Sequence, residues 1–193
     1  MSVTVGINGF GRMGRLSCRV GWQRPGYELI RVNETATDAL GSAHLLKFDS
    51  IYGAWQHDTS TRAESLLIDD QVVAYTSTPD ISTTDWSDCD IVIEATGLHH
   101  KIPGALQAYF DQGVKKVIVA APTKGALNIV YGVNDHLYEP DRDHLLSAAS
   151  CTTNCLAPVI QVMQAKVGIR HGTMTTIHAL TNTQTLVDKG HRD

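Results

Sequence analysis

The chain lacks the features that mark membrane proteins, nucleic-acid-binding proteins and secreted proteins. No apolar run approaches the roughly 20 residues of a membrane span, and the clearest run, residues 117–121, stops at Pro122. Lys and Arg total 16 against 20 Asp and Glu, so the net charge of −4 lacks the basic excess of a nucleic-acid-binding domain. Residues 1–6 run directly into a strand pattern with no secretory signal before it. We therefore expect a cytoplasmic protein with neither a membrane nor a nucleic acid as partner.

Cysteine is also scarce, and its spacing is informative. The four cysteines form no Cys-x-x-Cys pair, and they are not closely spaced like the disulfide-bonded cysteines of small secreted domains. In a cytoplasmic chain such cysteines are more often reactive or buried than disulfide-bonded. We interpret Cys18 and Cys89 as small buried side chains, and Cys155 mostly so, which leaves Cys151 for chemistry.

What is present indicates an α/β fold. Apolar residues make up 42% and charged residues 19%, an ordinary globular balance. The 193 residues suffice for one domain and part of a second, at roughly 100–200 residues per domain. Short β-branched runs alternate with helical patterns, which predicts a parallel, doubly wound sheet with right-handed crossovers.

The expected strands and helices follow from these patterns. The strands are residues 3–7, 28–32, 65–68, 71–75, 90–94, 117–121, 145–149 and 173–178, of which 65–68 and 71–75 form a hairpin. The helices are residues 15–20, 39–48, 102–110 and 151–167, the last with its regular part beginning just before Pro158.

A Gly-x-Gly-x-x-Gly motif joins the first strand to the first helix. Such a hexapeptide alone is a weak signal, but its position between a strand and a helix is that of a Rossmann-type dinucleotide-binding turn. Gly9 permits a tight turn, Gly11 lets a pyrophosphate approach the backbone, and Gly14 lets helix and strand pack closely. The N–H groups at the helix start would then face the phosphates.

An acidic residue stands at the end of the second strand. Glu34 lies twenty positions after Gly14, where a carboxylate accepts hydrogen bonds from the ribose hydroxyls of an adenosine. The same charge repels a 2′-phosphate, which favours NAD over NADP. The alternative is a solvated loop acid, but the spacing and the strand end favour the cofactor role.

Cys151 follows Ser150 where an expected strand meets an expected helix. The positive end of a helix dipole and its unpaired N–H groups stabilise a thiolate there. A thiolate nucleophile needs a base or an imidazolium partner, and His178 closes the last expected strand, from which it can point toward Cys151. The alternative is a zinc site made by Cys151, Cys155, His171 and His178. That spacing matches no common structural zinc pattern, so we expect no metal.

Three segments carry a resemblance to a known family. They are residues 8–15 (Asn-Gly-Phe-Gly-Arg-Met-Gly-Arg), 149–158 (Ala-Ser-Cys-Thr-Thr-Asn-Cys-Leu-Ala-Pro) and 175–181 (Thr-Thr-Ile-His-Ala-Leu-Thr). Together they resemble the phosphorylating glyceraldehyde-3-phosphate dehydrogenases, and the resemblance runs over essentially the whole chain. Residues 44–50 and 85–90 are more similar to the bacterial branch associated with arsenate resistance.

The resemblance implies oxidation of glyceraldehyde 3-phosphate with NAD as cofactor. Cys151 would attack the aldehyde, hydride would pass to the nicotinamide to leave a thioester, and phosphate would release 1,3-bisphosphoglycerate. Arsenate in place of phosphate would give 1-arseno-3-phosphoglycerate. His178 would act as base or ion-pair partner of Cys151 and, with the Cys151 N–H, stabilise the oxyanion.

The same resemblance implies the binding residues. Those for the cofactor are Gly9, Phe10, Gly11, Arg12, Met13, Gly14, Glu34, Ser77, Thr96 and Ala120. Those for the substrate are Ser150, Cys151, Thr152 and Thr181.

The sequence departs from the family pattern on the cofactor side. Glu34 stands where the family usually has Asp, Ser77 where it has Arg, and Ala120 where it has a hydroxyl residue. Relatives that also use NADP have a Thr after the acid, present here as Thr35, and a later Ser, where Gly190 stands. NADP use therefore stays open, with NAD favoured.

The family pattern also predicts the domain organisation. Residues 1–150 would form the NAD-binding Rossmann domain and residues 151–193 the beginning of a mixed α+β catalytic domain. The latter is much shorter than in the family, so we expect a fragment, or a chain that needs a partner, inactive alone. The resemblance implies a homotetramer. Two alternatives remain: a semialdehyde dehydrogenase or acyl-phosphate reductase, which the 151–155 run and the His178 segment argue against, and a non-catalytic NAD-binding module.

Overall fold

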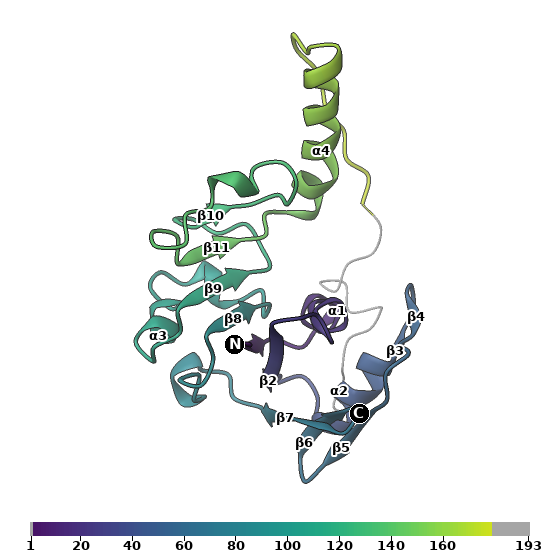
Figure 1. The fold of residues 1–193 in the computed structure, drawn as a ribbon, viewed down its shortest axis with the longest axis vertical. Coiled ribbons are helices and arrows are strands. Elements are labelled where there is room, and N and C mark those ends of the chain that lie inside the picture. The colour runs from purple at the N-terminus through teal and green to yellow at the C-terminus, as the bar shows by residue number, and fades with distance from the viewer. Residues whose placement is uncertain (1, 179–193) are drawn as a thin grey trace.

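The computed structural model describes residues 2–178 of the chain. Figure 1 shows a twisted sheet flanked by helices, with a final helix that projects from it. The helices are α1 (Arg12–Gly21), α2 (Ala39–Lys47), α3 (Gln107–Phe110) and α4 (Cys151–Lys166), with 3₁₀ turns at Ile81–Thr83, His99–Lys101 and Asp135–Leu137. The strands are β1 (Val3–Asn8), β2 (Tyr27–Asn33), β3 (Phe48–Asp49), β4 (Gly53–Ala54), β5 (Thr59–Arg62), β6 (Ser65–Ile68), β7 (Gln71–Thr76), β8 (Ile91–Glu94), β9 (Lys116–Val119), β10 (Leu127–Asn128) and β11 (Leu145–Ser147).

The main sheet of the described residues has nine strands in the order β10-β11-β9-β8-β1-β2-β7-β6-β5. Neighbours from β10 to β7 are parallel, and β7, β6 and β5 form an antiparallel edge. The order reverses at β1, which pairs with β2 on one side and β8 on the other. The doubly wound sheet expected from the sequence is confirmed, and ligands bind at the carboxyl ends of the strands beside such a reversal point.

Two apolar cores hold the helices against the sheet. α1 and α2 supply Cys18 and Leu46 to one core, where they pack with Val32 of β2. α3 and the segment before β8 supply the other core, where the rings of Trp86 and Tyr109 meet edge to face with centroids 5.5 Å apart. The central strand β1 is buried over residues 5–8, as a strand covered on both faces is, whereas β8 and β9 alternate buried with partly exposed residues.

Most elements lie close to their expected positions. The hairpin of β6 and β7 turns at Asp69 and Asp70, whose φ angles of 46° and 68° are the positive values that a two-residue type I′ turn requires. α1 begins earlier than expected, because Gly11 rather than a later residue serves as its N-cap. β5 adds a strand that the sequence did not reveal.

The helix expected over residues 102–110 is wrong for most of its length. Pro103 disfavours helical backbone at the preceding residue, and Ile102 has extended φ and ψ angles of −99° and 116°. Gly104 then takes a positive φ of 77°. Only the short α3 forms, anchored by Tyr109, which is fully buried.

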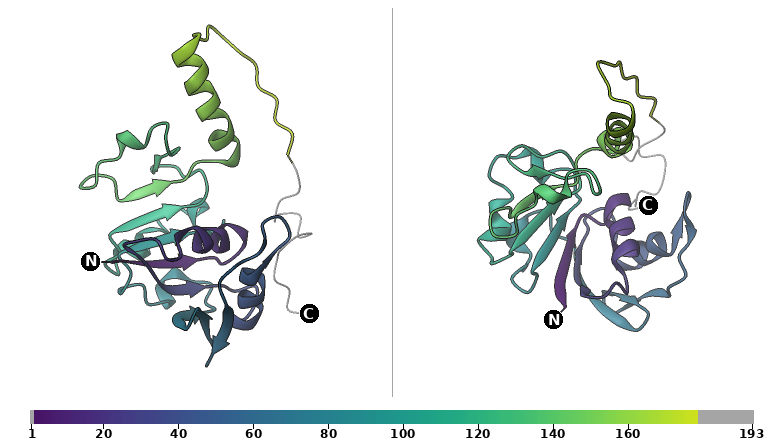
Figure 2. Two further views of the ribbon diagram at one scale, coloured as in Figure 1. Left: turned by 45° about the vertical axis from the view of Figure 1, so that its right-hand side comes forward. Right: turned by 45° about the horizontal axis from the view of Figure 1, so that its top comes forward.

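α4 begins earlier than expected and stands apart from the sheet. The Ser150 side chain accepts a hydrogen bond from the Thr153 N–H and caps the helix at Cys151, so Pro158 lies inside the helix. No residue of α4 is buried, and Figure 2 shows the helix projecting away from the sheet. The expectation that Cys155 is buried is therefore wrong, because it is exposed.

The strand expected over residues 173–178 does not form. A strand needs a neighbour to complete its backbone hydrogen bonds, and no described segment pairs with these residues. Ile177 is 97% exposed. Among the helices that the structure describes, none combines the length and the apolar character needed to cross a membrane.

Two leucines of α2 test the packing of this helix. Leu46 is fully buried, so Leu46→Ala should lower the free energy of unfolding by about 2–5 kcal/mol. Leu40 is 65% exposed on the same helix, and Leu40→Ala should change it by less than about 0.5 kcal/mol. Urea unfolding followed by circular dichroism measures both values. Equal losses for the two variants would contradict this packing.

Candidate functional site

Five residues expected to bind the cofactor, and one expected to bind substrate, gather at the carboxyl ends of the parallel strands. The strand-end residues that pair side by side across six strands are, in order, Thr76, Asn33, Asn8, Glu94, Val119 and Ser147. The expected site residues follow within a few positions of these strand ends: Ser77, Glu34, Gly9, Thr96, Ala120 and Ser150. Because these strands are parallel, the sheet brings all six together on both sides of its reversal point.

The turn after β1 has no room for side chains at two of its glycines. Gly9 has a φ of +88°, and a Cβ atom on it would lie 2.5 Å from the Thr96 backbone nitrogen. A Cβ atom on Gly14 would lie 2.1 Å from the Gly9 carbonyl oxygen. Gly11 is the N-cap of α1 and contributes no capping side chain to the first helical turn. A helix start of this kind suits an anionic group.

Two charged side chains form hydrogen bonds with the backbone of this turn. Arg15 is buried, and its Nη1 donates a hydrogen bond to the Phe10 carbonyl oxygen at 2.7 Å. Glu34 accepts hydrogen bonds from the Phe10 N–H at Oε2 and from the Ala36 N–H at Oε1, both at 2.8 Å. Its carboxylate is therefore oriented rather than loosely solvated, and retains lone pairs for a ribose hydroxyl. Phe10 is 1% exposed, so its ring does not reach the surface of the site.

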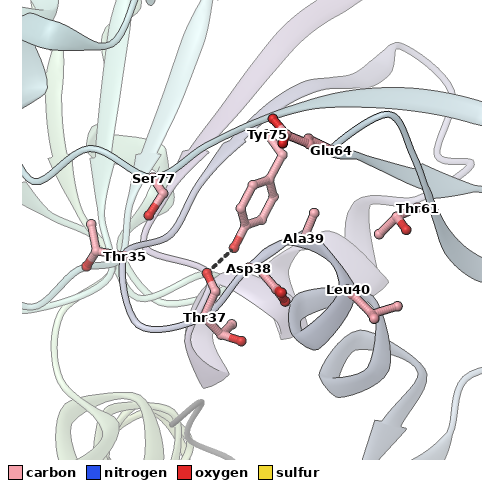
Figure 3. Close-up of a pocket in the computed structure, with 9 residues that line it drawn as sticks. All are labelled: Thr35, Thr37, Asp38, Ala39, Leu40, Thr61, Glu64, Tyr75 and Ser77. Carbon is pink, nitrogen blue, oxygen red and sulfur yellow. Dashed lines mark hydrogen bonds between the residues drawn. The ribbon is translucent and has the colours of Figure 1, made fainter. Parts of the chain in front are cut away.

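A cavity of about 740 Å³ opens beside the ends of β2 and β7. Figure 3 shows Thr35 and Ser77 on one side of Tyr75 and Glu64 on the other. The lining is made of hydroxyl groups, apolar groups and the carboxylates of Asp38 and Glu64, without a Lys or Arg. A cavity with these charges disfavours a phosphate group.

Arg12 and Met13, also expected at the cofactor, differ in their surroundings. Arg12 Nη2 forms an ion pair with Asp49 Oδ1 at 3.0 Å, and the Met13 side chain is exposed. Burial works against the charged form of Asp49. The N–H groups of Tyr52 and Ile51 and the Arg12 guanidinium outweigh that effect and hold the pKa of this carboxyl below its usual range. Arg12 is therefore held beside the start of α1.

Cys151 is exposed at the first position of α4. Its Sγ lies 4.0 Å from Thr152 Oγ1, and the Ser150 hydroxyl caps the same helix start. The three residues expected to hold substrate are thus together. Within residues 2–178, no hydrogen bond joins His178 to Cys151, so its role as a partner stays a prediction. Thr181 lies outside the described residues.

Comparison with known proteins agrees with this geometry. The family model described as glyceraldehyde 3-phosphate dehydrogenase, NAD binding domain, matches residues 3–102, which is more than half of the chain. The chain belongs to the glyceraldehyde-3-phosphate dehydrogenase family. The model for the C-terminal domain of the same family matches residues 150–193. The resemblance read from the motifs, and NAD as the cofactor of this domain type, are confirmed.

Individual relatives give the same result. The chain is 52% identical to glyceraldehyde-3-phosphate dehydrogenase 3 of Nostoc sp. and 41% identical to the glyceraldehyde-3-phosphate dehydrogenase of Geobacillus stearothermophilus, in each case over 100% of this chain and 58% of the relative. It is 42% identical to the cytosolic glyceraldehyde-3-phosphate dehydrogenase of Chlamydomonas reinhardtii, over 96% of this chain and 55% of the relative. The chain therefore spans somewhat more than half the length of the curated relatives it matches.

The candidate site also rests on residues that the sequence analysis did not single out. Asn8, Asn33 and Glu94 are buried at the last paired positions of three neighbouring strands, and Tyr109 reaches two of them from α3. The signal that could have revealed them is a polar residue closing an otherwise apolar strand. The alternative zinc ligands are not grouped, and no metal-binding cluster of His, Cys, Asp or Glu occurs within residues 2–178.

Thiol labelling tests which cysteines of this glyceraldehyde-3-phosphate dehydrogenase domain are accessible for chemistry. Burial raises the pKa of Cys18 and of Cys89 to about 12 in each case, so both stay protonated in the folded protein through neutral and mildly alkaline pH. Cys151 and Cys155 are exposed. Iodoacetamide with peptide mass spectrometry should label only the latter pair until denaturant is added. Labelling of Cys18 in the native protein would contradict the described packing of α1.

Proposed function

We propose that this chain binds NAD and forms the cofactor-binding and aldehyde-capturing part of a phosphorylating glyceraldehyde-3-phosphate dehydrogenase. The observation that carries the proposal is the position of the Gly9 turn after β1 and of Cys151 after β11, at one edge of a parallel sheet. The names of its relatives support glyceraldehyde 3-phosphate as the substrate. The division of the chain into residues 1–150 and 151–193 belongs to the same proposal.

The residues at the turn after β1 fit NAD. Gly9 and Gly14 lack the Cβ atoms that would crowd the turn, and Glu34 is oriented to accept from a ribose hydroxyl. NAD, when bound, supplies the nicotinamide ring that accepts a hydride. Glu34 and the acidic cavity lined by Asp38 and Glu64 oppose a 2′-phosphate, so NAD is favoured over NADP. Calorimetric titration with NAD and with NADP measures the two affinities, and equal affinities would contradict the preference for NAD.

Cys151 supplies the nucleophile in this proposal. Its thiolate sulfur bonds to the aldehyde carbon, and protonation of the resulting oxyanion gives a hemithioacetal. Loss of the proton from oxygen to His178 as base, and of a hydride from carbon to the nicotinamide ring that bound NAD would supply, would leave a thioester on Cys151. A phosphate oxygen then bonds to the thioester carbonyl carbon, the carbon–sulfur bond breaks, and 1,3-bisphosphoglycerate leaves with the thiolate restored. The N-terminal end of α4 stabilises the anionic sulfur.

The proposal also assigns roles to His178 and to the residues that hold phosphate groups. His178 acts as base toward the thiol and as cation beside the thiolate, which requires it to approach the start of α4. Ser150, Thr152 and Thr181 hold the phosphate groups of substrate and acceptor. These roles rest on the match of residues 149–158 and 175–181 to the family.

The use of arsenate and the oligomeric state rest on the same resemblance. Arsenate has the shape and charge of phosphate and would form 1-arseno-3-phosphoglycerate, which is labile, and residues 44–50 and 85–90 support this use. We also propose a cytoplasmic homotetramer. Light scattering measures the mass in solution, and a mass of one chain for the longer protein would exclude the tetramer.

Two glycines with similar backbone test the cofactor site. Gly9 and Gly26 have φ angles of +88° and +80°, but a Cβ atom meets Thr96 only at Gly9, while Gly26 has open space. Both Ala variants should lose about 1–2 kcal/mol of stability through backbone strain. Gly9→Ala should in addition weaken NAD binding at least about tenfold, because the turn must move away from Thr96. Calorimetry with thermal unfolding separates the two effects, and equal NAD affinities in both variants would count against this site.

A pair of cysteines on α4 tests the chemistry. NADH formation from glyceraldehyde 3-phosphate, NAD and either phosphate or arsenate should fall at least about a thousandfold in Cys151→Ser. Cys155→Ser, one helical turn away and equally exposed, should retain the rate. The assay follows NADH absorbance. Turnover that survives Cys151→Ser would rule out the thioester, whereas NAD binding without turnover is expected both of the non-catalytic module and of a chain that needs a partner.

A further inference from the structure

A buried polar cluster lies directly beneath the candidate cofactor site. Asn8, Glu94 and Tyr109 are each no more than 1% exposed. The Tyr109 hydroxyl donates to Glu94 Oε2 at 2.6 Å and accepts from Asn8 Nδ2 at 2.6 Å, and Asn8 Nδ2 lies 3.3 Å from the same carboxylate oxygen. Burial, followed by the charge of Glu94, raises the pKa of Tyr109 well above its usual value, so the phenol remains a donor.

The other oxygen of Glu94 faces the site. Oε1 accepts hydrogen bonds from the Thr96 N–H at 2.9 Å and from the Thr96 hydroxyl. The Thr96 nitrogen is the atom that a Cβ on Gly9 would approach to 2.5 Å. Glu94 thus fixes the turn after β8 at the point where it touches the turn after β1.

Backbone contacts extend this connection across the reversal point of the sheet. The Ala95 N–H donates to the Asn8 carbonyl oxygen at 2.7 Å, and the Gly9 N–H donates to the Asn33 carbonyl oxygen at 2.9 Å. The Asn33 Nδ2 donates to Asn8 Oδ1 at 2.8 Å. The polar chain therefore joins the ends of β2, β1 and β8.

Stability alone does not account for this cluster. Burying a carboxylate is costly, and apolar residues of similar volume usually fill such positions at no loss of stability. No ion pair of Glu94 occurs among residues 2–178, and its charge is held by hydrogen bonds from three separate elements. Charge-assisted hydrogen bonds are short and directional, so they determine position more strongly than apolar contacts do.

We propose that Glu94 and Tyr109 are positioning residues for the dinucleotide, which hold the Thr96 turn at the distance from the Gly9 turn that NAD binding requires. Neither side chain touches the cofactor in this proposal. It rests on the proposed NAD binding, and it adds the residues that set the geometry of that site.

Tyrosine variants test the proposal in the 193-residue chain. Tyr109→Phe removes the donor to Glu94, and NAD binding measured by calorimetry should weaken roughly tenfold. The control is Tyr27→Phe, because the Tyr27 hydroxyl is buried and has no hydrogen-bond partner among the described residues. The control should change the affinity less than about twofold. Thermal unfolding checks that both variants are folded at the titration temperature. Glu94→Gln serves as a second variant, with the same expected loss of NAD affinity.

A double-mutant cycle separates positioning from general destabilisation. If Tyr109 acts through Glu94 on Thr96, the effects of Tyr109→Phe and Thr96→Val on NAD affinity should be strongly non-additive, whereas Tyr27→Phe and Thr96→Val should add. Additive effects of Tyr109→Phe and Thr96→Val, or an unchanged affinity in both Tyr109→Phe and Glu94→Gln, would overturn the proposal.

Hydrogen exchange of the protein without cofactor provides a readout independent of NAD. In Tyr109→Phe, peptides covering residues 94–98 and 8–12 should exchange faster, while those covering β5 and β6 should not change. If the wild-type chain failed to bind NAD, the proposed function would fall, and this measurement would decide only whether Glu94 and Tyr109 hold the two turns together. Unchanged exchange at both turns would overturn it.

Discussion

The contact between the turn after β1 and the turn after β8 constrains the rest of the site. A Cβ atom on Gly9 would lie 2.5 Å from the Thr96 nitrogen, so the two turns meet with no side chain between them. This close approach is available because β1 and β8 are paired in parallel with Asn8 opposite Glu94. The close approach of the two turns is therefore a consequence of strand register, and any shift of one strand along the other would alter it.

Burial of the central strand β1 leaves the end of that strand as the place for its polar side chain. α1 and α2 pack in one apolar core and α3 with its flanking loops in the other, and residues 5–7 of β1 are buried and carry no polar side chain. Asn8, Asn33 and Glu94 come at the last paired positions, where hydrogen-bonding partners begin. The Cys151 helix starts from the end of another strand of the same sheet and so belongs to this edge, although α4 itself has no buried residue.

Parts of the site were readable from sequence because the information there is local. A Cβ atom on Gly14 would meet the Gly9 carbonyl oxygen a few positions away, the positive φ of Gly9 is a local backbone property, and the capped helix start at Ser150 is a local hydrogen bond. The strand expected at 173–178 failed because no described segment pairs with it, whereas the helix expected at 102–110 failed for a local reason, the extended backbone before Pro103 and the positive φ of Gly104. The Glu94 cluster was missed because its members come from three separate elements.

The amino-acid sequence by itself determined the alternation of strands and helices, the glycine turn, the acid at the end of β2 and the exposed cysteine at a helix start. Each of these depends on backbone preferences or spacings within a short stretch of chain. Only the tertiary structure decided the strand order, the contact of Gly9 with Thr96 and the burial of Glu94 with Tyr109. The physical reason is that such contacts join residues distant in sequence, and the packing of whole elements sets their distances.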